Sequence, residues 1–492
     1  MKDKLVRQLP YALLLLVFVL HLPFLAADPD YYLSDSRDAF TDEGLNTSQL
    51  RNYINHGQLD FYECDNLIKT PLFNGLLFLP LKILGTQHIV ARVTILLSII
   101  LLLFISMRST YLKSIIAILS ITTLLQYFVF QYSHFSLSEM ISTASIMVGM
   151  FFLYQYIENR ILYKNHLLFA SVFIAIAYYA KIQFIYIMPL IPIVMFVSIC
   201  LKKKQPLNYN GPGIKDFATS IQWMFLLFLI YLIFWYWPNH EIFNYVLNEE
   251  ASGKYANLFL MPRTIGFNII YVLFSSRTWP ANLLFALSFV TGCILFFKSR
   301  DRHYRILFTL VVAWLIIESH KLTMIYLPAR YLVSYYFAAG LMSSIVIHQI
   351  LHLQKKSKQW RFAGAALLLL FVTNNFIDYV SMFKNREFKI SAVNKYLESG
   401  MEKPNQNLAL GPWAPSLTWE CKAISKPVWY QFFNDDNLLE QNPRIVISEP
   451  GEADSNQAYS LQNISLEQYA DSSRTFTIGK WMVTVFWMKP AQ

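Results

Sequence analysis

The chain has 492 residues, of which 55% are hydrophobic and 15% are charged, and its formal net charge is +10. Soluble domains carry about 25% charged residues, so this composition excludes an ordinary soluble protein and indicates a membrane protein. The basic residues form short clusters between apolar runs, as in membrane-protein loops, and not the single patch expected of a nucleic-acid-binding protein.

Motifs for nucleotide binding and for metal chemistry are missing from the sequence. It contains no Walker loop, no GxGxxG and no HExxH motif. The four cysteines form no CxxC pair and have no histidine at metal-ligand spacing. These cysteines are Cys64, Cys200, Cys293 and Cys421. Zinc and iron–sulfur sites are therefore not expected.

The apolar runs predict about eleven transmembrane helices, because a span needs about 20 mainly apolar residues. The first run follows a basic N-terminus like a signal peptide, but no convincing cleavage site follows it, so we expect a retained helix. The predicted spans are 10–27, 88–107, 112–132, 137–157, 166–180, 183–200, 219–237, 280–297, 305–318, 331–349 and 361–379. Two shorter apolar segments, 72–84 and 263–275, have the length of interfacial or re-entrant pieces.

Basic residues occur at every second junction between these spans. The junctions that contain them are 108–113, 158–165, 201–218, 298–305 and 350–361. Together with Lys2, Lys4 and Arg7, they predict a cytoplasmic N-terminus by the positive-inside rule. The opposite face then receives the outer loop 28–87, the shorter outer loops and the tail.

The predicted fold class is an α-helical polytopic membrane protein with a small C-terminal α/β domain. We expect the membrane domain over residues 1–380 and the extracytoplasmic α/β domain over residues 381–492. The tail begins with a helical pattern, EFKISAVNKYLESG, that ends at Gly400. Four strand-like runs follow it, NLAL, RIVIS, RTFTI and WMVTVFW.

Asp42 and Glu43 stand side by side where the chain has just left the first span. One interpretation is structural. Thr41 would cap a helix that ends at Gly57, and each acid in its first turn would stabilise it by about 0.3–1 kcal/mol. The other interpretation is a functional site, and it depends on charged residues elsewhere on the outer face.

Further charged residues lie at the outer ends of other spans, namely Lys69, Glu139, Lys181, His320, Lys321 and Arg330. Each has a structural alternative, since Lys181 could snorkel, Glu139 could cap its helix and Arg330 could contact headgroups. Inserting an unpaired charge costs about 2.5–3.5 kcal/mol. Acids and bases from several outer loops at one membrane level therefore favour a site.

In this order the residues resemble the GT-C superfamily of membrane glycosyltransferases, in particular the branch with the protein O-mannosyltransferases and the lipid A aminoarabinose transferase. That pattern has an acidic pair, a Lys/Pro-Pro-Leu element, a later carboxylate, a lysine before an apolar helix and a late Arg-Tyr pair. The matching positions are Asp42-Glu43, Lys69-Thr70-Pro71-Leu72, Glu139, Lys181 and Arg330-Tyr331. Thr70 stands where a first proline is usual.

The resemblance implies a sugar donor on a polyprenyl phosphate and a protein or glycolipid acceptor, at the outer face of the inner membrane. The catalytic pair would be Asp42, as general base, and Glu43. The residues that would hold or position the acceptor are Glu139 and Tyr331. The residues that would face the donor phosphate are Lys69, Lys181, His320 and Arg330. Transfer with inversion is expected; no cofactor is required, although the acids are compatible with a divalent metal.

Two other functions stay open at this point. A transporter or flippase of a lipid-linked sugar would need ionisable residues near the middle of the bilayer and internal repeats with broken helices. The sequence shows no repeat, and its candidate charges lie at outer helix ends. An envelope scaffold whose tail binds partners would leave the outer acids and bases without a role.

Overall fold

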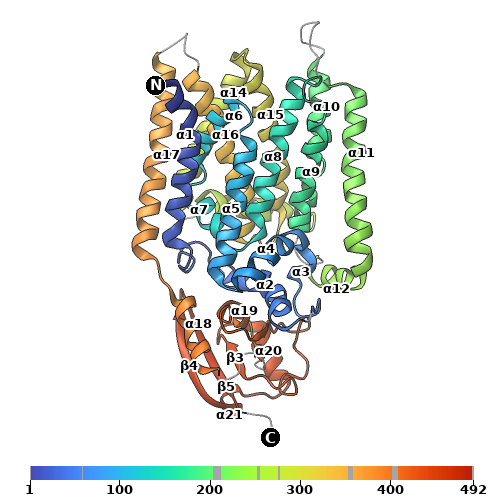
Figure 1. The fold of residues 1–492 in the computed structure, drawn as a ribbon, viewed down its shortest axis with the longest axis vertical. Helices are drawn as coiled ribbons and strands as arrows, with labels where there is room; N and C mark the ends of the chain where they lie inside the picture. The colour runs from blue at the N-terminus through green and yellow to red at the C-terminus, as the bar shows by residue number, and fades with distance from the viewer. Residues whose placement is uncertain are drawn as a thin grey trace.

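Long apolar helices form a bundle, and the N-terminus lies at the end of the bundle that is opposite the C-terminal sheet (Figure 1). The computed structural model describes residues 2–57, 59–202, 212–251, 255–274, 277–352, 358–401 and 408–489. The helices at the predicted spans are α1 (Lys2–His21), α5 (His88–Ser106), α6 (Thr110–Thr122), α7 (Tyr127–His134), α8 (Ser138–Glu158), α9 (His166–Ala180), α10 (Leu190–Lys202), α11 (Ile214–Tyr231), α14 (Trp279–Lys298), α15 (Arg302–Glu318), α16 (Val333–His352) and α17 (Lys358–Asn385).

Several of these helices can cross a membrane. Among the described residues, eight are long and apolar enough, and a ninth is counted if α6 and α7 form one bent span. The segments around α1 and α9 are apolar but shorter. The protein is therefore an integral membrane protein with several spans, while the predicted count of eleven is not confirmed. The two short segments of the prediction are α4 (Pro71–Leu84) and α13 (Met261–Phe274).

The span predicted over 112–132 is broken, and this part of the prediction is wrong. α6 and α7 meet at an angle of 98°. The Gln126 side chain starts α7 by accepting hydrogen bonds from the backbone N–H groups of Phe128 and Val129, both at 3.0 Å. A polar cap inside an apolar run ends one helix and begins another, which apolarity by itself does not reveal.

The centre of the bundle is formed by α8 and α16, which are buried along most or all of their length. Because these helices are buried on nearly every side, neither of them needs a polar face toward solvent. Small residues on α8 allow its neighbour α9 to approach closely, since the Ser142 hydroxyl donates to the Ala177 carbonyl at 2.8 Å and Gly149 lies beside Ala170.

A layer of shorter helices covers the end of the bundle that faces the sheet (Figure 1). The first outer loop contributes α2 (Asp38–His56), α3 (Asn66–Lys69) and α4. Other short elements are η1 (Leu22–Phe24), η2 (Ile182–Ile187), η3 (Leu232–Tyr236), η4 (Trp237–Asn239), α12 (His240–Ala251), η5 (Ser319–Thr323) and η6 (Ala329–Leu332). These elements and the adjoining ends of the long helices carry the charged residues of the outer face.

The C-terminal domain, from α18 to β5, contains a five-stranded mixed sheet in the order β2-β1-β3-β5-β4. Its elements are α18 (Lys389–Gly400), β1 (Leu408–Leu410), α19 (Ala414–Leu417), β2 (Ile424–Lys426), β3 (Ile445–Ser448), α20 (Ala453–Leu461), α21 (Leu466–Tyr469), β4 (Ala470–Ile478) and β5 (Trp481–Met488). The predicted helix and the four predicted strand runs are confirmed. The short edge strand β2 was not predicted, because three residues carry too little pattern.

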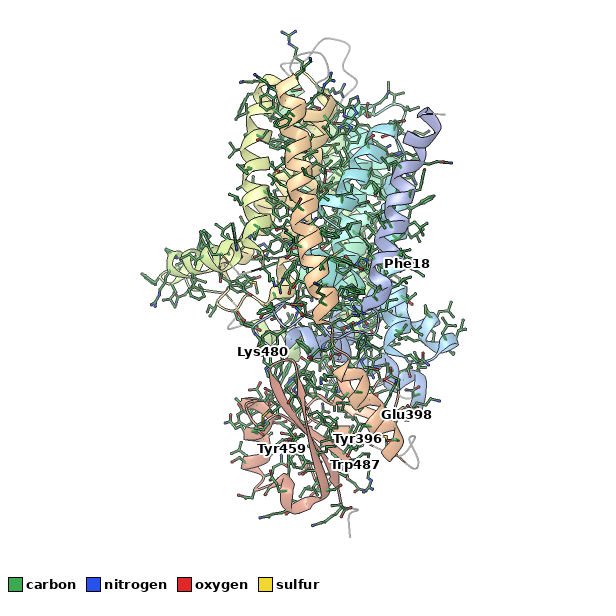
Figure 2. All side chains as sticks on the ribbon, turned by 90° about the vertical axis from the view of Figure 1, so that its left-hand side faces the viewer. Phe18, Tyr396, Glu398, Tyr459, Lys480 and Trp487 are labelled. Carbon is green, nitrogen blue, oxygen red and sulfur yellow. The ribbon has the colours of Figure 1, made fainter. Side chains whose placement is uncertain are left out.

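The C-terminal domain contacts the membrane part at several points. The Asp28 carboxylate, just after α1, caps α18 by accepting from the backbone N–H groups of Lys389 at 2.6 Å and Ile390 at 3.1 Å. Figure 2 shows Lys480, at the tip of the β4–β5 hairpin, next to the bundle, and Tyr396 and Trp487 further down in the domain. The domain is therefore held against the outer-loop helices.

The predicted orientation in the membrane depends on basic junctions that are only partly described. The junctions 201–218 and 350–361 lie partly outside the described residues, as do the side chains of Lys2, Lys4 and Arg7.

Candidate active site

The helix that carries the acidic pair begins earlier than predicted. α2 starts at Asp38 with Arg37 as its N-cap residue, so Thr41 is not the cap. Asp42 and Glu43 consequently lie in the second turn, beyond the first turn in which acids stabilise the helix dipole. Gly57 ends the helix with a left-handed φ of 77°, as expected. The structural explanation of the pair as first-turn acids is therefore wrong.

Asp42 forms an ion pair with Arg330, which lies on η6 just before α16. Two further carboxylates surround the same guanidinium. Asp38 Oδ2 lies 3.8 Å from Arg330 Nη1, and Glu139 Oε1 lies 3.7 Å from Arg330 Nε. Three acids from two helices therefore face one arginine, which retains 22% of its side-chain exposure.

Glu139 also pairs with Lys181, and this contact joins the start of α8 to the end of α9. Both side chains are buried, so Lys181 does not snorkel to the membrane surface. The Tyr331 ring lies between the two cations, 5.2 Å from Lys181 Nζ and 5.4 Å from the Arg330 guanidinium carbon. The structure thus brings Asp42, Glu139, Lys181, Arg330 and Tyr331 into one connected group.

A cavity of about 360 Å³ opens beside this group. The predicted site residues that line it are Lys69, Glu139, Lys181, His320 and Tyr331. The rest of its wall is mainly apolar and aromatic and comes from η2, the end of α11 and α12. A cavity whose wall combines a few charged side chains with mainly apolar ones suits a ligand with a charged head and a long apolar tail.

Two other predicted site residues in the cavity wall, Lys69 and His320, also contact neighbours. Lys69 pairs with Asp65 one turn earlier on the loop before α3. The His320 ring contacts Tyr186 at a centroid distance of 4.4 Å, and its Nδ1 is 2.8 Å from the Ile317 carbonyl oxygen.

Glu43 lies apart from the Asp42–Arg330 group, on another face of α2. Its Oε1 accepts from Arg92 Nε at 3.0 Å and from the Ser136 backbone N–H at 2.6 Å, and His88 Nε2 lies 3.2 Å from its Oε2. Burial by itself would raise the pKa of Glu43, but Arg92 and His88 outweigh it and hold this pKa well below its ordinary range. With its oxygens occupied in this way, Glu43 links α2 to Arg92 of α5 and to Ser136 between α7 and α8.

The sequence interpretation missed Asp38, although it precedes Asp42 by one helical turn and therefore lies on the same face. Its Oδ1 accepts from Ser34 Oγ at 2.6 Å, while its buried Oδ2 has no hydrogen-bond partner among the described residues. Glu139 Oε2 and the Tyr132 hydroxyl are also buried and have no hydrogen-bond partner among the described residues. Leaving a buried polar atom without a partner costs about 1–3 kcal/mol, and such atoms concentrate at functional sites.

A second missed group lies next to the cavity, which Lys321 and Tyr186 line. The Glu318 carboxylate accepts from Trp314 Nε1 at 3.0 Å, Tyr186 OH at 2.7 Å and Ser334 Oγ at 2.8 Å. Lys321 Nζ lies 2.6 Å from Glu318 Oε2 and 2.8 Å from the Tyr331 carbonyl oxygen. The i,i+3 spacing of Glu318 and Lys321 is the signal that could have revealed this pair. It holds η5 against η6 and so supports the Arg330-Tyr331 segment.

Metal ligation has no geometric support in the part of the chain that the structure describes, because no group of three or more His, Cys, Asp or Glu side chains there is arranged to hold an ion.

Known proteins resemble this chain in fold and not in sequence. No protein-family model and no curated protein matches the sequence. ArnT from Cupriavidus metallidurans in the apo state is 12% identical with a TM-score of 0.64, over 99% of this chain and 98% of that chain. The same protein bound to undecaprenyl phosphate gives a TM-score of 0.61 at 12% identity, over 96% and 97%.

A third solved structure is the archaeal oligosaccharyltransferase AglB from Archaeoglobus fulgidus, in complex with an inhibitory peptide and a dolichol-phosphate. It is 11% identical with a TM-score of 0.53, over 98% of this chain and 74% of that chain. At these identities the likeness establishes the fold alone, and it agrees with the fold that the resemblance implied.

The buried ion pair between Glu43 and Arg92 makes a testable contribution to stability. Glu43→Gln leaves the Arg92 guanidinium buried without a charged partner, which costs about 3–5 kcal/mol of stability. We expect a clear fall in the thermal unfolding midpoint in detergent. The difference from wild type should begin to narrow as the pH falls below 4.5, the ordinary carboxyl value, and should disappear only below the lowered pKa of Glu43 in the folded protein, because the contribution of a lowered pKa is complete above the ordinary value and is lost between the two. Glu398→Gln, which changes an exposed acid of α18, is the control. An unchanged midpoint in Glu43→Gln would contradict this role.

Proposed function

We propose that this protein is a glycosyltransferase that moves a sugar from a polyprenyl-phosphate donor to an acceptor at the outer face of the cytoplasmic membrane. The transfer inverts the anomeric centre. The observation that carries the proposal is the Asp42–Arg330 pair beside a cavity whose wall combines lysine side chains with mainly apolar and aromatic ones. It occurs in a fold shared with ArnT bound to undecaprenyl phosphate and with AglB in complex with a dolichol-phosphate.

The donor would place its phosphate at the charged part of the cavity wall and its isoprenoid chain along the apolar wall. The residues assigned to the phosphate are Lys69, Lys181, His320 and Arg330. In the structure Lys181 is paired with Glu139 and Arg330 with Asp42, so the phosphate would share these cations with the acids. Phosphate gains negative charge as it leaves, and cations that are already in place stabilise that charge without reorganisation.

In the reaction, an oxygen or nitrogen of the acceptor bonds to the anomeric carbon of the sugar while the bond from that carbon to the phosphate oxygen breaks. The electron pair of the broken bond stays on the phosphate. The proton of the acceptor passes to Asp42 as general base. Arg330 orients Asp42 and neutralises the leaving phosphate, for which a guanidinium offers two parallel donors. A direct displacement of this kind inverts the anomeric centre.

The acceptor would occupy the side of Asp42 that is away from the phosphate. Asp38 and Glu139 each have an oxygen without a partner among the described residues near Arg330, and together with Tyr331 they are the groups that we assign to holding the acceptor. We propose a protein or glycolipid acceptor, since AglB was solved in complex with an inhibitory peptide. Glu43 is assigned to positioning, through its contact with Arg92.

A transporter of the lipid-linked sugar is less well supported by the same geometry. Glu139 lies in the first turn of α8, Lys181 directly follows α9, and Arg330 precedes α16. The charges thus lie at helix ends, whereas a transporter site is expected near the middle of the bilayer.

We further propose that the protein lies in the inner membrane with its N-terminus in the cytoplasm and its site outside. Single cysteines at Thr110 and Ser399, both exposed and at opposite ends of the bundle, test this in a Cys200→Ser background, because Cys200 is exposed. An impermeant thiol reagent applied to intact cells should label Ser399→Cys and leave Thr110→Cys unlabelled until the cells are permeabilised. The reverse pattern would invert the orientation.

Asp42→Asn tests the general base. The amide keeps the size of the side chain but cannot take a proton, so transfer should fall by about 10²–10⁴-fold, the usual contribution of a positioned base. Expression and the thermal midpoint should change little. Asp35→Asn, which changes an acid of the same loop that is 94% exposed, is the matched control and should transfer normally. Turnover of Asp42→Asn close to wild type would remove Asp42 from catalysis.

Arg330 variants test donor recognition separately from catalysis. Lysine is a point charge, whereas the guanidinium matches two phosphate oxygens. Binding of a polyprenyl-phosphate sugar to purified protein should weaken in Arg330→Lys and be lost in Arg330→Ala. A residue that only contacts headgroups would tolerate lysine, because lysine snorkels equally well. Equal binding by wild type and both variants would contradict the assignment of Arg330 to the phosphate.

A further inference from the structure

We propose that the C-terminal domain positions the catalytic helix: it holds α2 in place and thereby sets where Asp42 stands relative to Arg330. This inference concerns the position of α2, and its catalytic meaning rests on the proposed function. It starts from an unusual property of α2. Fourteen of its 19 residues are buried although most of these are polar, so neighbouring elements must satisfy them.

The face of α2 that contacts the C-terminal domain is a single stripe at helical spacing. Its members are Arg37, Thr41, Gly44 and Arg51, which follow each other by one or two turns, together with Asn52, the residue directly after Arg51. Asp38 and Asp42 lie about a third of a turn away around the helix, and Glu43 lies about two thirds of a turn away. One face therefore meets the domain, one meets the site, and one meets Arg92 of α5. In Figure 1, α19 of the domain lies directly beneath α2.

At Gly44 the backbones of the two parts are in close contact. A Cβ atom at this position would stand 2.4 Å from the Ser416 backbone nitrogen and 2.5 Å from the Pro415 carbonyl carbon, both in or beside α19. The Ser416 hydroxyl donates to the Thr41 carbonyl at 2.9 Å. Backbone therefore meets backbone, and any side chain at position 44 must move α2 away from α19.

The second half of α2 is held to the domain by two polar side chains. The Asn52 amide pairs with both backbone groups of Ser425 on the edge strand β2, accepting from its N–H and donating to its carbonyl at 3.1 Å each. Arg51 donates to the Pro415 carbonyl, and its guanidinium carbon lies 4.1 Å from the centroid of the Trp419 ring. Asn52 thus satisfies backbone groups of the edge strand β2 that no further strand pairs with.

The start of α2 is held by charge. Arg37 lies 3.3 Å from Glu449 and 3.0 Å from Glu452 of the domain, and Glu449 also accepts from Trp413 Nε1 at 2.7 Å. These contacts hold the first turn of α2, which carries Asp38, against the C-terminal domain. Because the domain contacts one face of α2 and Arg92 contacts another through Glu43, α2 can shift only if a buried contact is broken.

Such a helix transmits displacement of the domain to the site. Misplacing a catalytic group by about 1 Å can cost about 10²-fold in rate. Gly44 and Ser416 are positioning residues under this proposal, since they touch neither the cavity nor Arg330. Their loss should lower the rate of transfer while leaving the cavity that receives the donor in place.

The experiment compares Gly44→Ala and Ser416→Ala with two controls. Gly75→Ala adds a methyl group at a glycine of α4 with no atom within 4 Å of its Cβ position. Ser399→Ala removes a hydroxyl that bonds only within α18. The readouts are hydrogen exchange of the α2 backbone in the intact purified protein, kcat for transfer, and KM for the lipid-linked donor. Ser416→Ala adds no atoms, so it remains informative if Gly44→Ala fails to fold.

We expect faster exchange over residues 38–48 in both test variants and in neither control. We also expect kcat to fall about 10- to 100-fold in Gly44→Ala and about 3- to 10-fold in Ser416→Ala, with the donor KM within about 3-fold of wild type. Exchange and kcat that stay at the wild-type level in Ser416→Ala would overturn the proposal. If α2 exchange responds as expected but wild-type protein transfers no sugar, the positioning stands and the proposed function fails.

Discussion

The burial of a polar helix, α2, is the constraint on which the rest of the outer face depends. Buried polar groups without partners would cost more stability than a domain can spare, so each face of α2 must meet a matching surface. Glu43 meets Arg92 and Ser136 of the bundle, and Asn52 meets the edge strand of the tail. The membrane part and the C-terminal domain are therefore not independent: each satisfies one side of the helix that carries Asp42.

The same requirement explains how so many charges coexist near a membrane. Lys181 is neutralised by Glu139, Lys69 by Asp65 and Arg330 by Asp42. Removing one partner from such a pair is expensive, whereas exchanging one anion for another is not. A phosphate that enters the cavity would find cations already held in place by acids. Under the proposed function, the pre-organised ion pairs would serve both the stability of the site and the binding of an anionic headgroup.

Individual elements show how far sequence reasoning extended. The strands of the tail and α18 were predicted because alternation and capping are local patterns. The break between α6 and α7 was missed, because one polar residue, Gln126, redirects an otherwise continuous apolar run. The start of α2 was misplaced by four residues, from Thr41 to Arg37 as the N-cap, and with it the explanation of Asp42 and Glu43 as first-turn acids failed. Asp38 was overlooked although it lies one turn before Asp42.

By itself, the sequence determined the membrane class, the positions of most apolar helices and the set of charged residues on the outer face, because hydropathy and charge act residue by residue. Only the tertiary structure decided which charges meet. It joined Asp42 to Arg330 across 288 positions of chain and sent the adjacent Glu43 to Arg92 instead. Neighbours on a helix point about 100° apart, so adjacent acids reach different partners, and those partners are set by how helices pack.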